Sequence, residues 1–353
     1  MRSLKNIMVT GGAGFIGSNF IRYLLTKTTF DGKIVNFDKL TYAGNLQNLA
    51  DLQNDTRYIF VKGDICDIDA VKRAFEKYSI DTVVHFAAES HVDRSILGPA
   101  DFINTNILGT FNLLECAKNF WKNFDGKLFH HVSTDEVFGS LGESGYFTET
   151  TPYSPRSPYS SSKASSDHLV NAYFHTYGLP VTLSNCSNNY GYYQFPEKLI
   201  PVMIENMLDE KPLPVYGDGK NIRDWLFVED HNGAVWTIMN NAKTGESYNI
   251  GGENEWENIK LVNVLCETVA QIQGKDKDCH KKLITFVKDR PGHDRRYAID
   301  CSKIKRELGW KQRYSFDDGL KKTARWYLNN RQWVEDIKSG EYKNWINRNY
   351  FQR

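Results

Sequence analysis

The first half of the chain alternates short apolar runs with longer amphipathic ones, and this alternation constrains the fold more than any other feature. It is typical of βαβ units, in which helices join parallel strands and cover both faces of one sheet. The expected strands are Asn6–Thr10, Lys33–Asp38, Tyr58–Gly63, Thr82–Phe86, Leu128–Ser133 and Val181–Cys186. The expected helices are Phe15–Thr26, Asp67–Tyr78, Pro99–Phe120 and Tyr159–Tyr177. We therefore expect an α/β fold with a doubly wound parallel sheet.

The pattern changes after Cys186 to short mixed elements separated by turn signals such as Gly217-Asp218-Gly219. This change predicts a smaller mixed α/β C-terminal domain that binds the substrate. We place the first domain at residues 1–187 and the second mainly at 188–353. A strand at Asp224–Val228 and a helix at Asp230–Asn240 are expected in a segment of about 224–250 that can return to the main sheet. Ser315 is expected to cap a helix that runs through Tyr327.

A glycine-rich loop joins the first expected strand to the first helix. Gly11, Gly14 and Gly17 allow a tight turn, a close approach of backbone to a pyrophosphate, and close helix packing. Asp38 ends the second strand, where a carboxylate accepts hydrogen bonds from ribose hydroxyls and repels a 2′-phosphate. A Rossmann-type domain that prefers NAD to NADP is therefore expected.

Composition excludes several other classes of protein. The 353 residues carry a net charge of +1, which provides no basic field for nucleic acid or an anionic membrane. The six cysteines are widely spread without zinc-site spacing, so we expect no metal. No signal peptide or apolar span of membrane length is apparent, which predicts a cytoplasmic location.

Four Tyr-x-x-x-Lys pairs occur, at Tyr23, Tyr58, Tyr159 and Tyr216. Only Tyr159 and Lys163 open a helix, where residues four apart share a face, and follow a strand that ends near Thr134. A nearby ammonium favours the phenolate form of a tyrosine. With Thr134 orienting the hydroxyl, this set can remove the proton of a secondary alcohol while hydride leaves its carbon.

Two adjacent carboxylates, Asp135 and Glu136, directly follow Thr134. Adjacent acids in a loop are usually solvated, but their position at the active-site end of a strand favours a catalytic role. Oxidation of an alcohol to a ketone makes the adjacent C–H acidic. One carboxylate can then abstract that proton while its protonated neighbour assists the departure of a hydroxyl group.

These residues together identify a resemblance. The chain resembles the extended short-chain dehydrogenase/reductases, and within them the family of dTDP-glucose 4,6-dehydratases. The resemblance covers nearly the whole chain. The matching stretches are Thr10–Gly17, Asp38–Asn45, Ala87–Arg94, Ser133–Glu136, Tyr159–His168, Asn185–Tyr190, Phe195–Pro201, Arg223–Trp225 and Asp289–Asp300.

The resemblance implies that Tyr159 takes the O4 proton of glucose as NAD⁺ accepts the C4 hydride. Glu136 then abstracts the C5 proton, Asp135 protonates the departing C6 hydroxyl, and the hydride returns to C6. NAD should stay tightly bound through turnover. The expected product is dTDP-4-dehydro-6-deoxy-D-glucose, and the catalytic residues are Thr134, Asp135, Glu136, Tyr159 and Lys163.

Further positions follow from the matched stretches. Expected cofactor contacts are Gly11, Gly14, Phe15, Ile16, Gly17, Asp38, Lys39, Leu40, Thr41, Asp64, Ile65, Phe86, Ala87, Ala88, Ser90, Thr105, Tyr159, Lys163 and Asn189. Expected substrate contacts are Ser90, Thr134, Asn188, Lys198, Leu199, Pro214, Val215, Tyr216, Arg223, Asn258, Asp289, Arg290, Pro291, Gly292 and His293. Of these, Lys198, Arg223 and Arg290 suit a diphosphate.

Three alternatives remain open. The substrate can be a UDP- or CDP-sugar, the reaction can be a 4-epimerisation, or the chain can be a catalytically silent NAD-binding interaction protein. Tyr192 departs from the proline that family members usually carry there, which leaves the substrate-loop geometry open. The resemblance also implies a homodimer through the helices at Pro99–Phe120 and Tyr159–Tyr177.

Overall fold

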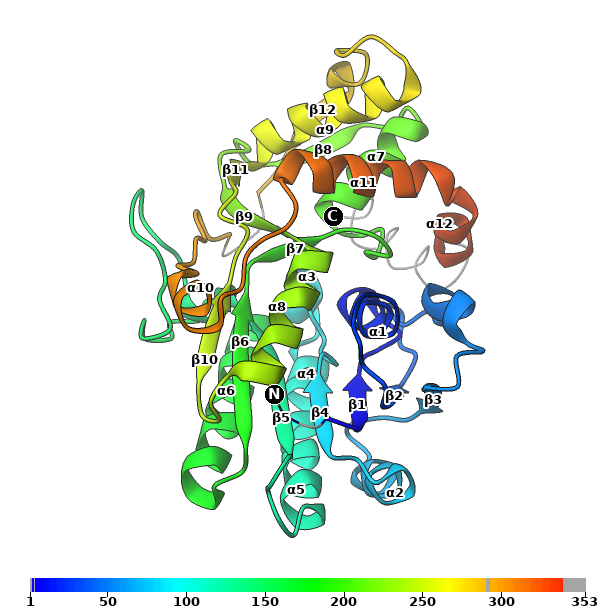
Figure 1. The fold of residues 1–353 in the computed structure, drawn as a ribbon. Coiled ribbons are helices and arrows are strands. Elements are labelled where there is room, and N and C mark those ends of the chain that lie inside the picture. Colours follow the sequence, from blue (N-terminus) through cyan, green and yellow to red (C-terminus); the bar gives the residue numbers. More distant parts are fainter. Residues whose placement is uncertain (1, 3, 290–292, 339–353) are drawn as a thin grey trace.

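A seven-stranded parallel sheet forms the centre of the molecule (Figure 1). The computed structural model describes residues 2, 4–289 and 293–338. The strands of this sheet are β1 (Asn6–Thr10), β2 (Lys33–Asp38), β3 (Tyr58–Lys62), β4 (Thr82–His85), β5 (Leu128–Thr134), β6 (Val181–Cys186) and β10 (Ser247–Ile250). Their spatial order is β10-β6-β5-β4-β1-β2-β3, so the winding direction reverses between β1 and β4. This order confirms the expected doubly wound Rossmann-type sheet, whose ligand crevice lies at that reversal.

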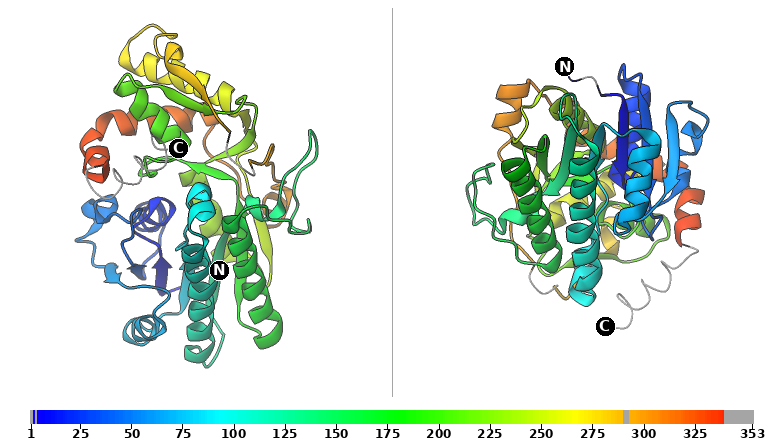
Figure 2. Two further views of the ribbon diagram at one scale, coloured as in Figure 1. Left: turned by 180° about the vertical axis from the view of Figure 1, so that it is seen from behind. Right: turned by 90° about the horizontal axis from the view of Figure 1, so that it is seen from below.

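Helices cover both faces of the sheet, as Figure 2 shows from two sides. One face carries α1 (Phe15–Lys27) and α8 (Val228–Asn241), and the other carries α2 (Ile68–Tyr78), α5 (Thr110–Phe120) and α6 (Pro158–Tyr177). Side chains alternate between faces along each strand. In β1, Ile7 and Val9 pack with the first set of helices and Met8 packs with the second. Burying each such side chain stabilises the fold by about 1.5–3 kcal/mol.

The sequence located most of these elements to within one residue at each end. Asp67 caps α2 as expected, because its side chain accepts hydrogen bonds from the backbone N–H groups of Asp69 and Ala70. The expected helix over residues 99–120 is interrupted. It consists of α4 (Pro99–Phe102), a π-helical segment η2 (Ile103–Gly109) and α5. A short helix α3 (Val92–Leu97) precedes it.

A smaller second part lies against the carboxyl ends of the sheet strands (Figure 1). It contains a three-stranded sheet and a two-stranded sheet with its own hydrophobic core. Its strands are β7 (Asn188–Tyr190), β8 (Leu213–Tyr216), β9 (Ile222–Phe227), β11 (Glu255–Glu257) and β12 (Ile284–Val287). Its helices are α7 (Leu199–Leu208), α9 (Asn258–Gln273), α11 (Phe316–Asn329) and α12 (Arg331–Lys338).

The segment expected to return to the main sheet, about 224–250, differs from the prediction in which of its strands does so. The strand expected at Asp224–Val228 is β9, and it pairs with β7 and β11 rather than with the main sheet. The strand that returns to the main sheet is β10, which pairs with β6. Ser315 caps α11 through the backbone N–H of Asp318, as expected, although α12 follows it. A short helix α10 (Ser302–Leu308) packs near β10.

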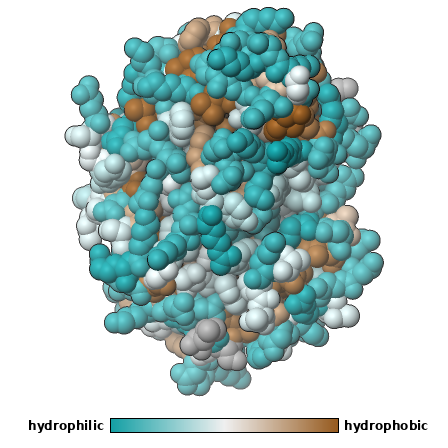
Figure 3. Space-filling view, turned by 45° about the horizontal axis from the view of Figure 1, so that its top comes forward, coloured by the Kyte–Doolittle hydropathy of each residue, from teal (hydrophilic) through white to brown (hydrophobic). Residues whose placement is uncertain are grey.

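Hydrophilic residues cover most of the face that Figure 3 shows, with hydrophobic residues in scattered groups. Within the residues described, none of the helices is both long and apolar enough to cross a membrane. All six cysteines are free thiols. Among the described residues, His, Cys, Asp and Glu side chains form no group of three or more that could hold a metal ion.

Candidate active site

A cavity of about 480 Å³ opens at the carboxyl ends of the main-sheet strands, where the second part of the molecule meets them. Most of the expected site residues line it, although they come from segments far apart in the sequence. They are Gly11, Gly14, Phe15, Ile16, Gly17, Asp38, Lys39, Thr41, Asp64, Ile65, Phe86, Ala87, Ala88, Ser90, Thr105, Thr134, Asp135, Glu136, Tyr159, Lys163, Asn188, Asn189 and Lys198. A volume of this size suits a small-molecule or cofactor site.

The glycine loop forms one wall of the cavity. Gly11 has a φ of +68°, and a Cβ there would lie 2.7 Å from the backbone nitrogen of Ala87. A Cβ on Gly17 would lie 2.3 Å from the Gly11 carbonyl oxygen, so a side chain there would push α1 away from the loop. No side chain caps the start of α1. Its first N–H groups are therefore available to an anion such as a pyrophosphate.

The Asp38 carboxylate stands at the end of β2, in the position that suits an adenosine ribose. Its two oxygens accept hydrogen bonds from the backbone N–H groups of Ala13, at 2.9 Å, and Leu40, at 2.8 Å. Burial raises the pKa of Asp38, while these two hydrogen bonds lower it. Each oxygen keeps a further lone pair for a hydroxyl. Leu40 does not line the cavity itself, but it orients this carboxylate.

Thr134 ends β5, and a short 3₁₀ turn η3 (Asp135–Phe138) follows it at once. The Thr134 hydroxyl accepts from the N–H of Glu136 at 3.3 Å and lies 3.4 Å from Asp135 Oδ1. Asp135 is only 2% exposed, whereas Glu136 is partly exposed to the cavity. Burial raises the pKa of Asp135 well above its ordinary value, and the charge of Glu136 raises it further. A raised pKa favours the neutral carboxyl group, which is the form that can donate a proton.

Tyr159 and Lys163 lie in the first two turns of α6. Pro158 at the first helical position and a capping box between Ser157 and Ser160 fix the start of that helix. The Lys163 ammonium donates to the Val132 carbonyl oxygen at 2.9 Å and contacts His131. Both side chains are buried, so burial raises the pKa of Tyr159 and lowers that of Lys163.

The remaining expected substrate residues lie outside the cavity lining. They are Leu199, Pro214, Val215, Tyr216, Arg223, Asn258, Asp289 and His293. Arg290, Pro291 and Gly292 lie outside the described residues. The structure nevertheless brings several of them together. His293 Nδ1 lies 2.6 Å from Asp289 Oδ1 and its ring lies beside that of Tyr216, while Arg223 is close enough to Asp135 to lower its pKa.

The cavity also holds residues that were not expected there. Tyr42, Glu89, Phe195 and Glu197 line it, and each falls in a stretch that carried the resemblance. The Arg94 guanidinium stacks 3.5 Å from the centre of the Tyr42 ring. Sequence periodicity alone has no signal for such contacts, because they join loops that are distant along the chain.

Unpaired polar atoms on the cavity wall fit a bound ligand. Asp135 Oδ2, Asn189 Oδ1 and Gln194 Oε1 are buried and have no hydrogen-bond partner among the described residues. An unpaired buried acceptor costs about 1–3 kcal/mol unless a ligand or water satisfies it. Together with the side-chain-free loop at Gly11 and the acceptor at Asp38, these atoms fit a dinucleotide and a polar substrate.

Comparison with known proteins agrees with this geometry. The family described as GDP-mannose 4,6 dehydratase matches residues 8–323. The chain is 55% identical over 358 residues to a dTDP-glucose 4,6-dehydratase of Shigella flexneri, covering 98% of each chain. It is 46% identical, with a TM-score of 0.88, to the crystal structure of a dTDP-glucose 4,6-dehydratase from Streptomyces venezuelae with NAD bound, covering 94% of this chain and 100% of that one. A dTDP-glucose 4,6-dehydratase from Bacillus anthracis in complex with NAD has a TM-score of 0.84 and 47% identity, over 95% of this chain and 100% of that one.

Proposed function

The chain belongs to the GDP-mannose 4,6 dehydratase family, and within this family we propose that it catalyses the NAD-dependent 4,6-dehydration of dTDP-glucose. The product is dTDP-4-dehydro-6-deoxy-D-glucose, and the enzyme is a hydro-lyase. The observation that carries the proposal is the placement of Asp135, which is buried and has a raised pKa, and the neighbouring Glu136 with Tyr159 in one cavity. A simple dehydrogenase or 4-epimerase has no need of this acid and base pair.

The first domain supplies the residues proposed to hold NAD. The glycine loop and the N-terminus of α1 would receive the pyrophosphate, and Asp38 would accept from the adenosine ribose. NAD supplies the hydride acceptor for C4 and the hydride donor for C6, so redox is balanced within one turnover. We propose the division at residues 1–187 and 188–353, with β10 returning to the first domain.

Tyr159 is the proposed base for the O4 hydroxyl. In this proposal the positive charge of Lys163 stabilises the phenolate. The Thr134 hydroxyl hydrogen-bonds to the phenol and lowers its pKa. The Tyr159 oxygen removes the O4 proton while the C4–H bond breaks. The carbonyl group that forms at C4 makes the C5 proton acidic, and this prepares the elimination.

Glu136 and Asp135 divide the elimination between them. Glu136 removes the C5 proton, and the neutral Asp135 donates its proton to the C6 hydroxyl as water leaves. Glu136 then returns its proton to C5 when hydride reaches C6. One turnover thus leaves Tyr159 one proton richer and Asp135 one proton poorer. Thr134 contacts both side chains, and its hydroxyl provides a path by which the proton passes back.

The second part of the molecule is the proposed site of the sugar nucleotide. Lys198 and Arg223, with Arg290 beyond the described residues, are the proposed partners of its diphosphate. The Lys198 ammonium already reaches across the cavity to the Ser90 carbonyl oxygen at 3.3 Å. The other proposed contacts in this part lie on β7 and β8, at the N-termini of α7 and α9, and at Asp289 and His293.

We also propose that the enzyme works as a cytoplasmic homodimer. Figure 2 shows α5 and α6 side by side on the face away from α1 and α8. The outer surface around them exposes large apolar side chains, which are Leu97, Ile103, Leu108, Phe111 and Tyr177. Exposed apolar side chains grouped on neighbouring helices are typical of a subunit interface.

The experiment that tests the proposal is incubation of the purified protein with dTDP-glucose and, separately, with UDP-, CDP- and GDP-glucose. Mass spectrometry should show the loss of one water from the dTDP-sugar and a slower or absent reaction with the others. An unchanged mass with an altered sugar configuration would indicate epimerisation. An unchanged sugar with NAD bound to the protein would indicate a silent NAD-binding protein.

A further inference from the structure

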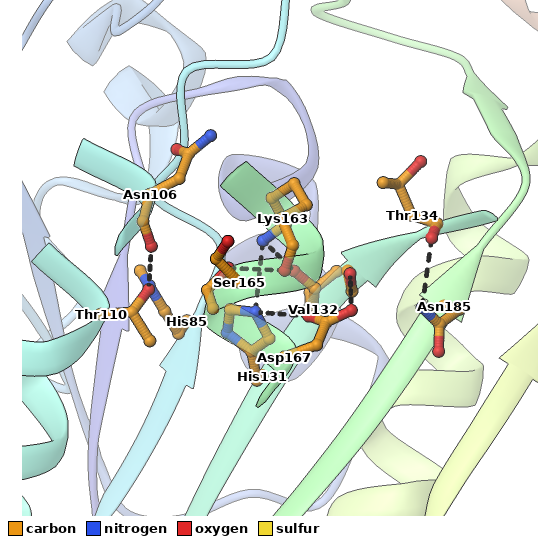
Figure 4. A network of polar contacts seen from close by, with 12 residues as sticks. His85, Asn106, Thr110, His131, Val132, Thr134, Lys163, Ser165, Asp167 and Asn185 are labelled. Carbon is orange, nitrogen blue, oxygen red and sulfur yellow. Dashed lines mark hydrogen bonds and ion pairs between the residues drawn. The ribbon is translucent and has the colours of Figure 1, made fainter. Parts of the chain in front are cut away.

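A buried polar network surrounds the Lys163 ammonium, as Figure 4 shows. His131 Nε2 is 3.3 Å from Lys163 Nζ and 3.1 Å from Asp167 Oδ1, so the imidazole ring stands between ammonium and carboxylate. The side chains of His131 and Asp167 have no exposed surface. Asp167 follows Lys163 by four residues on α6, which places both on one face of the helix.

The Lys163 ammonium needs a compensating charge. Burial lowers the pKa of Lys163, and Asp167 is the charged group that raises it most. A fully buried lysine without such help can titrate at a pKa of about 5–6. A neutral amine would not stabilise the Tyr159 phenolate. The first proton transfer therefore depends on a nearby group that keeps Lys163 protonated.

The other titratable groups behind Lys163 are neutral. His85 on β4 and His131 on β5 are buried, which lowers the pKa of each well below its ordinary value. Burial also raises the pKa of the Cys186 thiol on β6 to about 12. The pKa of Asp167, raised by burial to about 6, leaves this carboxylate ionised at pH 7. Asp167 is therefore the anion of this network.

Hydrogen bonds and a nearby charge stabilise the ionised form of the Asp167 carboxylate. The Ser133 hydroxyl donates to Asp167 Oδ2 at 2.7 Å, and the Tyr153 phenol and His168 also favour the ionised form. On the cavity side, burial raises the pKa of Asp135 well above its ordinary value, and the charge of Glu136 raises the pKa of Tyr159.

We propose that Asp167 is a positioning residue whose carboxylate, acting across the His131 ring, keeps Lys163 protonated so that Tyr159 can act as the base. His131 Nε2 accepts a hydrogen bond from the Lys163 ammonium, whereas Asp167 Oδ1, 3.1 Å from the same nitrogen, has no hydrogen-bond partner among the described residues. The effect of Asp167 on Lys163 is therefore one of charge and not of a continuous chain of hydrogen bonds. This inference rests on the proposed function.

The test compares Asp167→Asn with Asp167→Glu, which keeps the charge, in their kcat/KM for dTDP-glucose against pH. In Asp167→Asn the basic limb, on which Lys163 loses its proton, should move to lower pH by about 1 unit or more. In Asp167→Glu it should stay near the wild-type position, even where the rate is reduced. A uniform loss of rate in Asp167→Asn with an unmoved limb would overturn the inference and indicate a packing role.

A second readout needs neither turnover nor a folded Asp167→Asn variant. In wild-type protein labelled with ¹⁵N-lysine, the Lys163 side-chain resonance, identified by its loss in Lys163→Arg, should report a charged ammonium at about pH 8. A neutral amine at that pH would contradict the inference. A wild-type protein that leaves dTDP-glucose unchanged would instead refute the proposed function, while the lysine signal still decides the charge of Lys163.

Discussion

At the scale of single residues, burial separates two carboxylates that are adjacent in sequence. Asp135 is enclosed and its pKa is raised well above the ordinary value, whereas Glu136 faces the cavity. Environments that push the pKa values of neighbouring acids apart are a general way to obtain an acid and a base from like side chains. The proposed division of labour between the two therefore rests on their burial and not on their chemical identity.

Glu136→Gln tests the base of the elimination. Glutamine keeps the size of the side chain but cannot take the C5 proton. We expect C4 oxidation to proceed, visible as NADH absorbance on mixing with dTDP-glucose, while product formation falls by about 100-fold or more. Normal turnover in this variant would show that Glu136 is not the base.

Tyr159→Phe tests the preceding step. The variant removes the phenolic oxygen that receives the O4 proton and leaves the ring in place against Phe102. The rate of the first NADH absorbance change should fall by about 100-fold or more. The double variant with Glu136→Gln provides the control, since it should accumulate no NADH. Rapid NADH formation in either would refute the role of Tyr159.

At the scale of elements, the turn from β1 into α1 depends on the absence of side chains. A Cβ on Gly17 would meet the Gly11 carbonyl oxygen at 2.3 Å, whereas a Cβ on Gly142 would meet nothing within 4 Å. Gly17→Ala should therefore lower the free energy of unfolding by about 1–3 kcal/mol and weaken NAD binding.

Thermal unfolding and the NAD content of the purified variant measure these two effects. Gly142→Ala is the matched control, and we expect it to leave both unchanged. A Gly17→Ala variant with wild-type stability and full NAD content would show that helix α1 tolerates displacement from the loop.

The central strands and the helices on them were predictable because period-two and period-3.6 patterns report burial directly. The π-helical segment Ile103–Gly109 was not predictable from such patterns. It lets the Asn106 side chain accept from the Glu89 N–H and donate to the Glu89 carbonyl oxygen, contacts that no local pattern signals. β9 was placed in the wrong sheet for the same reason, since strand partners are set by tertiary packing.

The candidate site shows a similar limit. The proposed catalytic residues were predicted from motif and position, and the structure brings all five of them to one cavity. The proposed roles of Asp167 and His131 were not predicted from the sequence, because a carboxylate on a helix and a histidine in a strand are usual parts of a core. Tyr192 was noted only as a departure from the family. Its carbonyl oxygen accepts from Asn19 of α1 at 2.9 Å, and its ring packs against Phe227.

At the scale of the whole molecule, the exposed apolar face along η2 and α5 predicts self-association. Ile103 is 54% exposed on this face, and Phe286 on β12 is 57% exposed at a distant site. Ile103→Asp should place a charge in the proposed interface and shift the protein from dimer to monomer in sedimentation experiments. Phe286→Asp, the control, should remain a dimer. A wild-type monomer, or a dimer in both variants, would contradict the proposed interface.

Residues from both parts of the molecule line one cavity, and the proposed elimination needs the substrate held there against residues of the main sheet. The most direct test of that account is the reaction of dTDP-glucose in deuterated water, with the product analysed by NMR and mass spectrometry. We predict the loss of one water and the appearance of solvent deuterium at C5, because Glu136 exchanges its proton with solvent before returning it. A 4-epimer, or a sugar that keeps its C6 hydroxyl, would contradict the account.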